Sequence, residues 1–84
     1  MLADNELLRR YCSDRSESAF AELVERHADL VYSAALHQLN GNPDLARDVA
    51  QVVFTDLALK AASLQPSVSV AGWLYTSARF AAAT

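Results

Sequence analysis

The sequence predicts an all-α fold, a compact bundle of three to four helices. Apolar side chains recur every three or four residues over much of the chain, which is the spacing of one face of a helix. No segment of useful length alternates apolar and polar residues as a strand does. Gly41, Pro43 and Pro66 fall where the helical spacing breaks, so they divide the chain into blocks.

The N-terminal half contains the first two predicted helices. Residues 4–12 form a short helix with Leu7, Leu8 and Tyr11 on one face. Ser16 is a candidate N-cap for a long amphipathic helix over residues 17–39. A second apolar strip beside the first indicates that this helix packs against more than one neighbour. Asn40 and Gly41 then supply the stop.

A third helix is predicted over residues 44–64, with a wide apolar arc on one side. The arc consists of Leu45, Val49, Val52, Val53, Phe54, Leu57, Ala61 and Leu64. A polar stripe faces away from this arc and consists of Asp44, Asp48, Gln51 and Thr55. Asp56 and Lys60 are spaced as an i,i+4 ion pair. After a connection over residues 65–71, a last helix spans residues 70–83.

Length and charge limit the classes of function. The 84 residues suffice for one small domain, and the formal net charge of −3 argues against tight, non-specific adhesion to nucleic acid or anionic membrane. The N-terminus has no apolar core of the kind a signal peptide needs, and no stretch approaches the roughly 20 apolar residues of a membrane span. We therefore predict a soluble, cytoplasmic protein without a membrane partner.

The sequence gives little support for a catalytic or metal-binding site. The chain has one cysteine, Cys12, and two histidines that are far apart, so neither an internal disulfide nor a zinc-ligand spacing is present. We interpret Cys12 as a buried thiol and His27 as a partly satisfied histidine at the edge of the core. His37 is expected on the surface near the end of its helix. No enzyme activity, metal or cofactor is predicted.

Two patterns have both a functional and a structural interpretation. The polar stripe is either an ordinary solvated face or a docking surface for a partner protein. The last helix carries Trp73, Tyr75, Arg79 and Phe80. Aromatic rings beside a guanidinium are a combination that binds unstacked bases. The same side chains also serve to cover the edge of a core, with Trp73 buried and Arg79 extended over it.

Three strings resemble the second conserved region of bacterial sigma factors of the extracytoplasmic-function type. They are AFAELVERHADLVYSAAL, NPDLARDVAQVVFTDLALKA and AGWLYTSARFAAA, and the resemblance runs from about Ser18 to Thr84. It implies a transcription initiation factor that docks onto the clamp helices of core RNA polymerase and captures the melted non-template strand of the minus-ten promoter element. An anti-sigma protein is a further candidate partner.

The resemblance also implies site residues. Asp48 and Gln51 would contact the polymerase, with Asp44 and Thr55 nearby. The connection before the last helix would form a pocket for a flipped base. On the DNA side, the implied residues are Ser67, Ser69, Trp73, Thr76, Arg79 and Phe80.

The chain departs from the family pattern at several of these positions. Arg47 and Val52 stand where the family commonly has Glu, which weakens the acidic contacts to the polymerase. Phe80 replaces a usual Asn, and Thr76 replaces a frequent basic residue, which affects base preference and DNA affinity.

We expect residues 1–84 to be one sigma region 2 domain, with an N-terminal helix and connection (1–16), a helical hairpin (17–64) and a loop with the last helix (65–84). The open helical pattern at the end favours a domain excised from a longer factor. The alternative hypothesis is a non-catalytic protein-protein interaction domain without DNA binding.

Overall fold

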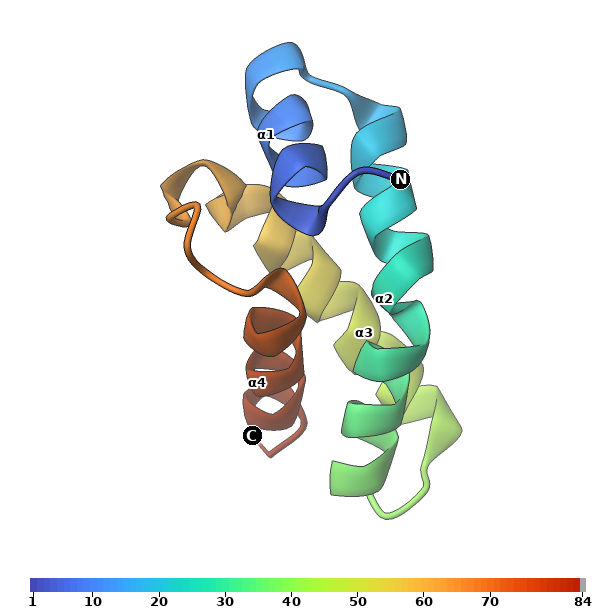
Figure 1. Ribbon diagram of the computed structural model, residues 1–84. Coiled ribbons are helices and arrows are strands. Elements are labelled where there is room, and N and C mark those ends of the chain that lie inside the picture. Colours follow the sequence, from blue (N-terminus) through green and yellow to red (C-terminus); the bar gives the residue numbers. More distant parts are fainter. Residues whose placement is uncertain (84) are drawn as a thin grey trace.

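The computed structural model describes residues 1–83, and it confirms the all-α prediction. The four helices are α1 (Asp4–Asp14), α2 (Glu17–Gln38), α3 (Pro43–Lys60) and α4 (Val70–Ala83), and a short 3-10 turn, η1 (Ala61–Ser63), follows α3 (Figure 1). None of these helices is long and apolar enough to cross a membrane.

Local hydrogen bonds explain where the helices begin. The Ser16 hydroxyl accepts the N–H of Ala19 at 3.1 Å, which confirms the predicted N-cap of α2. Asn42 does the same for α3, where its side chain accepts the N–H of Leu45 at 3.2 Å and Pro43 occupies the first helical position. Helix α3 therefore begins one residue before the predicted residue 44, with a cap that was not predicted.

Left-handed residues end the first two helices. Arg15 has φ 54° and closes α1 through its N–H to the carbonyl of Arg10, so this helix continues to Asp14, beyond the predicted residue 12. Asn40 and Gly41 have φ 56° and 83° after α2, as the predicted stop requires. Helices α2 and α3 are joined by this short turn and pack against each other as a helical hairpin.

The third helix is shorter than predicted. It ends at Lys60, and η1 replaces its last expected turn before the chain extends at Leu64. The Ser63 hydroxyl donates to the carbonyl of Lys60 at 2.8 Å, which satisfies one of the carbonyls left open at the helix end. Asp56 and Lys60 form no ion pair within the described part of the chain.

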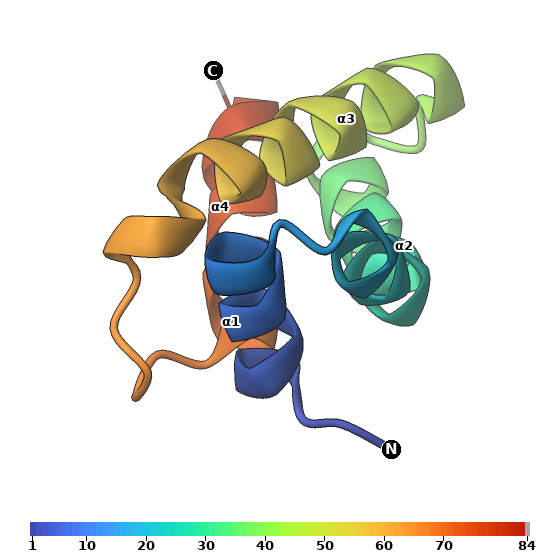
Figure 2. The same ribbon diagram turned by 90° about the horizontal axis from the view of Figure 1, so that it is seen from above.

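Helices α2, α3 and α4 pack against one another, and α1 packs against α2 and η1. Figures 1 and 2 show α1 between α2 on one side and η1 with the following loop on the other. The largest fully buried side chains come from the three mutually packed helices and are Leu23, Val31, Val53, Leu57 and Leu74. Two leucines of α1, Leu7 and Leu8, complete this core.

Candidate functional site

The polar stripe of α3 lies on the surface. Asp44, Asp48, Gln51 and Thr55 are all exposed along one side of the helix. An ion pair of 3.6 Å joins Arg47 Nη1 to Asp44 Oδ1 at the N-terminal end of the stripe. The stripe therefore presents two acids, an amide and a hydroxyl to a partner, as the sequence predicts for a docking surface or a solvated face.

The apolar arc predicted for α3 is too wide. Its buried part is narrow and centres on Ala46, Val53 and Leu57, because only that side of the helix faces α2 and α4. Leu45 and Val52 are about half exposed, and Leu59 is 78% exposed. These three residues lie seven positions apart on one line beside the polar stripe. We call Leu45, Val52 and Leu59 the apolar strip.

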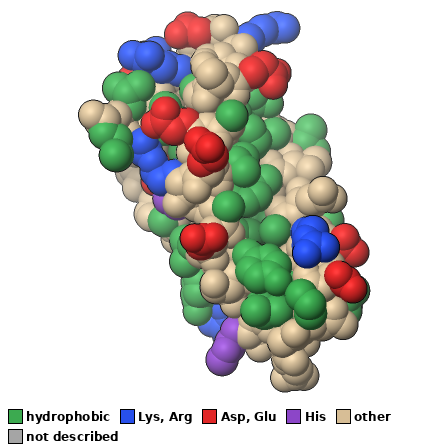
Figure 3. All heavy atoms as spheres, turned by 90° about the vertical axis from the view of Figure 1, so that its right-hand side faces the viewer, with side chains coloured by type: hydrophobic (Ala, Val, Ile, Leu, Met, Phe, Trp, Pro, Cys, Tyr) green, Lys and Arg blue, Asp and Glu red, His purple; other side chains and the backbone are tan. Residues whose placement is uncertain are grey.

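A shallow groove runs on the other side of the polar stripe, between α2 and α3. Its volume is about 730 Å³, and Gln51 and Thr55 of the stripe lie on its edge. Its apolar lining consists mainly of Phe20, Val24, Tyr32, Ala50, Phe54 and Ala58. Figure 3 shows a band of hydrophobic side chains on the face where α2 and α3 lie, with acidic side chains beside it. The stripe is thus flanked by apolar surface on both sides.

The loop before α4 connects to the helix through a cap that the sequence analysis missed. The hydroxyl of Ser69 accepts the N–H of Gly72 at 3.1 Å, and its carbonyl accepts the N–H of Trp73 at 2.9 Å. Ser69 is therefore the N-cap of α4, a role that a serine directly before a helical pattern signals. Ser67 lies in the same loop and is exposed.

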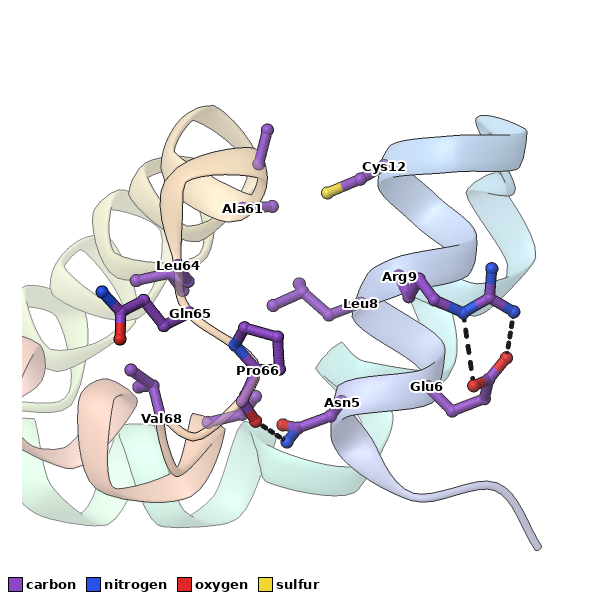
Figure 4. A pocket seen from close by; sticks show the side chains of 12 residues that line it. Asn5, Glu6, Leu8, Arg9, Cys12, Ala61, Leu64, Gln65, Pro66 and Val68 are labelled. Carbon is purple, nitrogen blue, oxygen red and sulfur yellow. Dashed lines mark hydrogen bonds and ion pairs between the residues drawn. The ribbon is translucent and has the colours of Figure 1, made fainter.

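A cleft of about 360 Å³ separates α1 from this loop. Figure 4 shows Leu8 and Cys12 pointing from α1 toward the loop, and the Asn5 amide donating to the carbonyl of Pro66. The remaining apolar lining is supplied by Ala61, Leu64, Val68 and Val70. Glu6 and Arg9 pair with each other on the outer side of α1. This hydrogen bond from Arg9 lowers the pKa of the Glu6 carboxyl below its ordinary value.

The outer face of α4 presents aromatic and basic side chains. Tyr75, Thr76 and Arg79 are exposed, and Phe80 is 71% exposed. The Arg79 guanidinium lies 5.8 Å from the centre of the Tyr75 ring, within the range of a cation–π contact. Gln38 at the end of α2 joins these residues around a small hollow, which sequence reasoning did not anticipate because it brings together two helices distant in the chain.

Trp73 differs from these residues in its burial. It is half-buried and packs against the hydrophobic core, so most of its ring serves the structural role that the sequence left open. The predicted DNA-binding set is therefore divided by the fold. Four of these residues face solvent, namely Ser67, Thr76, Arg79 and Phe80. Ser69 caps α4, and Trp73 packs against the hydrophobic core.

A family comparison supports the sigma factor hypothesis. The family model described as Sigma-70 region 2 matches residues 23–84, from α2 onward through most of the chain. The chain belongs to this family. Neither the curated proteins nor the solved structures contain a match. As a sigma region 2 domain it acts in transcription initiation, and it interacts with core RNA polymerase and promoter DNA.

The sigma region 2 family is non-catalytic. Cys12 is exposed on α1, so its interpretation as a buried thiol was wrong; residue 12 lies on the side of α1 that faces the open cleft. His27 is 8% exposed, and its Nε2 atom lies 2.8 Å from Asp4 Oδ2, which confirms a satisfied histidine at the core edge. Within residues 1–83, no three His, Cys, Asp or Glu side chains are grouped to hold a metal ion.

Proposed function

We propose that this sigma region 2 domain docks onto the clamp helices of core RNA polymerase through α3. The observation that carries this proposal is the exposure of Asp44, Asp48, Gln51 and Thr55 on one line of the helix. A polar line between two apolar surfaces suits a helical partner, because apolar side chains supply contact area and polar ones fix the register. An anti-sigma protein that covers this surface would prevent docking onto the polymerase.

A pull-down with a clamp-helix fragment of the polymerase tests the docking proposal. The wild-type domain is expected to bind, and the double variant Asp48→Ala, Gln51→Ala is expected to bind at least about tenfold more weakly. Glu25→Ala is the control, since it removes an exposed acid of α2 that lies outside the groove. Equal binding by the double variant and the wild type would remove α3 from the interface.

We also propose that the loop before α4 and the outer face of α4 capture the minus-ten element as single-stranded DNA, on its non-template strand. Arg79 beside Tyr75 and the exposed Phe80 offer charge and ring faces to unstacked bases. After Lys60 the chain contains Arg79 and no acidic residue, so this end of the domain does not repel phosphates. The acids that give the chain its negative charge lie elsewhere.

Salt dependence tests the DNA proposal. Anisotropy of a labelled single-stranded oligonucleotide is expected to show weak binding that falls with salt, and Arg79→Ala is expected to reduce the slope of log K against log salt by about 0.7. Arg47→Ala removes the same charge from α3 and is expected to leave the slope unchanged. Undiminished binding by Arg79→Ala would exclude this residue, and no single-stranded DNA binding by the wild type would contradict the proposed capture of the minus-ten element by this face.

We further propose that the domain is of the extracytoplasmic-function type and that α1 belongs to it as one unit with residues 17–84. Support comes from the three sequence strings and from the packing of α1 against α2 and η1. Helix α1 lies outside the matched residues 23–84, yet its leucines share the core with the matched helices.

A further inference from the structure

The outer face of α4 continues onto the last turns of α2. The two helices pack against each other and run in the same direction, so their C-terminal halves lie at one end of the bundle (Figure 1). Besides the hollow beside Phe80, a second hollow of about 450 Å³ opens between these two halves. Gln38, Tyr75 and Arg79 line both hollows, so the two form one continuous surface.

The second hollow, which we call the α2–α4 hollow, brings polar side chains of α2 beside those of α4. Helix α2 contributes the apolar side chains of Leu30 and Ala34 and the exposed polar side chains of Ser33 and His37. His37 lies in the last turn of the helix and is exposed, as the sequence predicts. A hydroxyl and an imidazole therefore line the same hollow as the Arg79 guanidinium.

Carboxylates do not contribute to this surface within the described part of the chain. No aspartate or glutamate lines either hollow, whereas Asp29 of α2 lines the groove on the α3 side. Arg79 takes part in none of the ion pairs of residues 1–83, and its guanidinium contacts the ring of Tyr75. Its positive charge is therefore available to an anionic ligand.

A phosphodiester is the anion that this surface suits. In nucleic-acid complexes, phosphate oxygens accept hydrogen bonds from arginine, serine, glutamine and tyrosine side chains. The α2–α4 hollow has one side chain of each of these types and adds an imidazole. Because Tyr75 and Arg79 belong to both hollows, a strand bound on the outer face of α4 can reach the α2–α4 hollow along these side chains.

We propose that the α2–α4 hollow binds a phosphate of the single strand held by α4, and that His37 makes this contact dependent on pH. The inference rests on the proposed DNA binding, which assigns the loop and α4 but no residue of α2. Histidine is the side chain whose charge ordinarily changes between pH 5 and 8. When His37 carries a proton, the hollow contains two cations instead of one, so DNA binding strengthens as the pH falls.

The surroundings of His37 make this pH effect specific. The other titratable groups that line the hollow are Tyr75 and Arg79, both from α4, and residues of α1 and α3 do not line it. Tyrosine and arginine ordinarily keep their charge between pH 5 and 8. A change of DNA affinity in this range that depends on the hollow is therefore assigned to His37.

Binding of a labelled single-stranded oligonucleotide at two pH values tests the inference. Wild type is expected to bind about fivefold more tightly at about pH 5.5 than at about pH 7.5, and the slope of log K against log salt is expected to steepen by up to about 0.7. His37→Gln keeps a polar side chain at this exposed position but cannot take up a proton, so it is expected to show neither change. Equal pH dependence of wild type and His37→Gln would overturn the inference.

A relocated histidine separates a local contact from a change in net charge. Ala21 is exposed on α2 and lines neither hollow, so His37→Gln combined with Ala21→His restores a titrating group outside the surface. This protein is expected to remain as insensitive to pH as His37→Gln. Recovery of the wild-type pH dependence would contradict the contact. His27 is present in all three proteins, so its titration cancels in the comparison.

Neutral phosphate analogues test the chemistry of the ligand. In oligonucleotides with a single methylphosphonate at each position in turn, one position is expected to weaken wild-type binding about fivefold at the lower pH and to weaken His37→Gln less. Identical profiles of the two proteins would contradict a phosphate contact by His37.

A competition experiment distinguishes a DNA phosphate from free phosphate. Inorganic phosphate is expected to compete no better than sodium chloride of equal ionic strength. Loss of the pH effect in inorganic phosphate alone would assign the hollow to the free ion and overturn the DNA contact. Absence of oligonucleotide binding at both pH values would instead overturn the proposed DNA function, so the two failures are distinguishable.

Discussion

Asp4 and His27 form a hydrogen bond of 2.8 Å between Oδ2 and Nε2, and this contact joins the start of α1 to the middle of α2. The second carboxylate oxygen of Asp4 lies 3.0 Å from Arg26 Nη1, so one acid serves two side chains of α2. Every buried side-chain nitrogen or oxygen atom of residues 1–83 has a hydrogen-bond partner, and the imidazole of His27 depends on Asp4 for its own. The docking of α1 therefore rests on this carboxylate as well as on Leu7 and Leu8.

Replacement of Asp4 is expected to destabilise the domain. Asp4→Ala leaves the buried imidazole of His27 and the guanidinium of Arg26 without this acceptor, at a cost of about 2 kcal/mol in the free energy of unfolding. Urea denaturation followed by circular dichroism measures it. Asp14→Ala, at the exposed end of α1, is the control and should change stability by less than about 0.5 kcal/mol. A similarly small change in Asp4→Ala would show that Asp4 does not hold α1.

Replacement of two leucines of α3 by alanine is expected to change the free energy of unfolding by very different amounts. Leu57 is fully buried in the core, so Leu57→Ala should lower the free energy of unfolding by about 3 kcal/mol through lost burial and the remaining cavity. Leu59 is mostly exposed, and Leu59→Ala should leave stability within about 0.5 kcal/mol of wild type. Chemical denaturation of both variants checks this. A large loss in Leu59→Ala would mean that the apolar strip is covered in solution.

Trp73 and Phe80 divide the aromatic end of the domain into a structural and a surface part. Trp73→Ala is expected to cost about 2 kcal/mol of stability, because the ring packs against the core. Phe80→Ala should leave the unfolding midpoint nearly unchanged and weaken binding to single-stranded DNA. Thermal unfolding and oligonucleotide anisotropy together test the division. Equal stability loss in both variants would contradict it.

The pair between Glu6 and Arg9 predicts a pH dependence of stability. The lowered pKa of Glu6 in the folded domain means that its contribution is fully present above the ordinary value of 4.5 and disappears as the pH falls through the lower folded value. The melting temperature of Glu6→Gln is therefore expected to lie below that of wild type at neutral pH and to converge with it in acid.

Glu25→Gln serves as the comparison for this pH series. Glu25 is exposed and takes part in none of the ion pairs of residues 1–83, so its replacement is not expected to produce that convergence. A gap between wild type and Glu6→Gln that widens as the pH falls would contradict the assigned sign.

Sequence patterns predicted the elements because the local signals agree with the packing. Helical spacing located all four helices, and the predicted N-cap Ser16 and the predicted stop at Asn40 and Gly41 bracket α2. The cap of α3 by Asn42 was not predicted. The width of the apolar face of α3 was overestimated, since a helical wheel cannot show how many neighbours a helix has. Leu45 and Val52 are apolar but about half exposed.

Helical spacing could not predict contacts between residues that are far apart in the sequence. The exposed position of Cys12 and the contact of Asn5 with Pro66 both depend on where α1 docks, and no local pattern encodes that position. The cap at Ser69 was in principle readable, because a serine precedes the helical pattern by one residue. The polar stripe was located correctly because a surface line on one helix needs only the helical period.

The central claim is that polymerase and single-stranded DNA bind different faces of one sigma region 2 domain. Its most direct test measures both affinities for wild type, for Asp48→Ala, Gln51→Ala, and for Arg79→Ala. The first variant is expected to lose about tenfold for core polymerase and to keep its DNA affinity, and Arg79→Ala is expected to do the reverse. The claim would be contradicted if either variant lost both affinities, or if both variants kept both affinities.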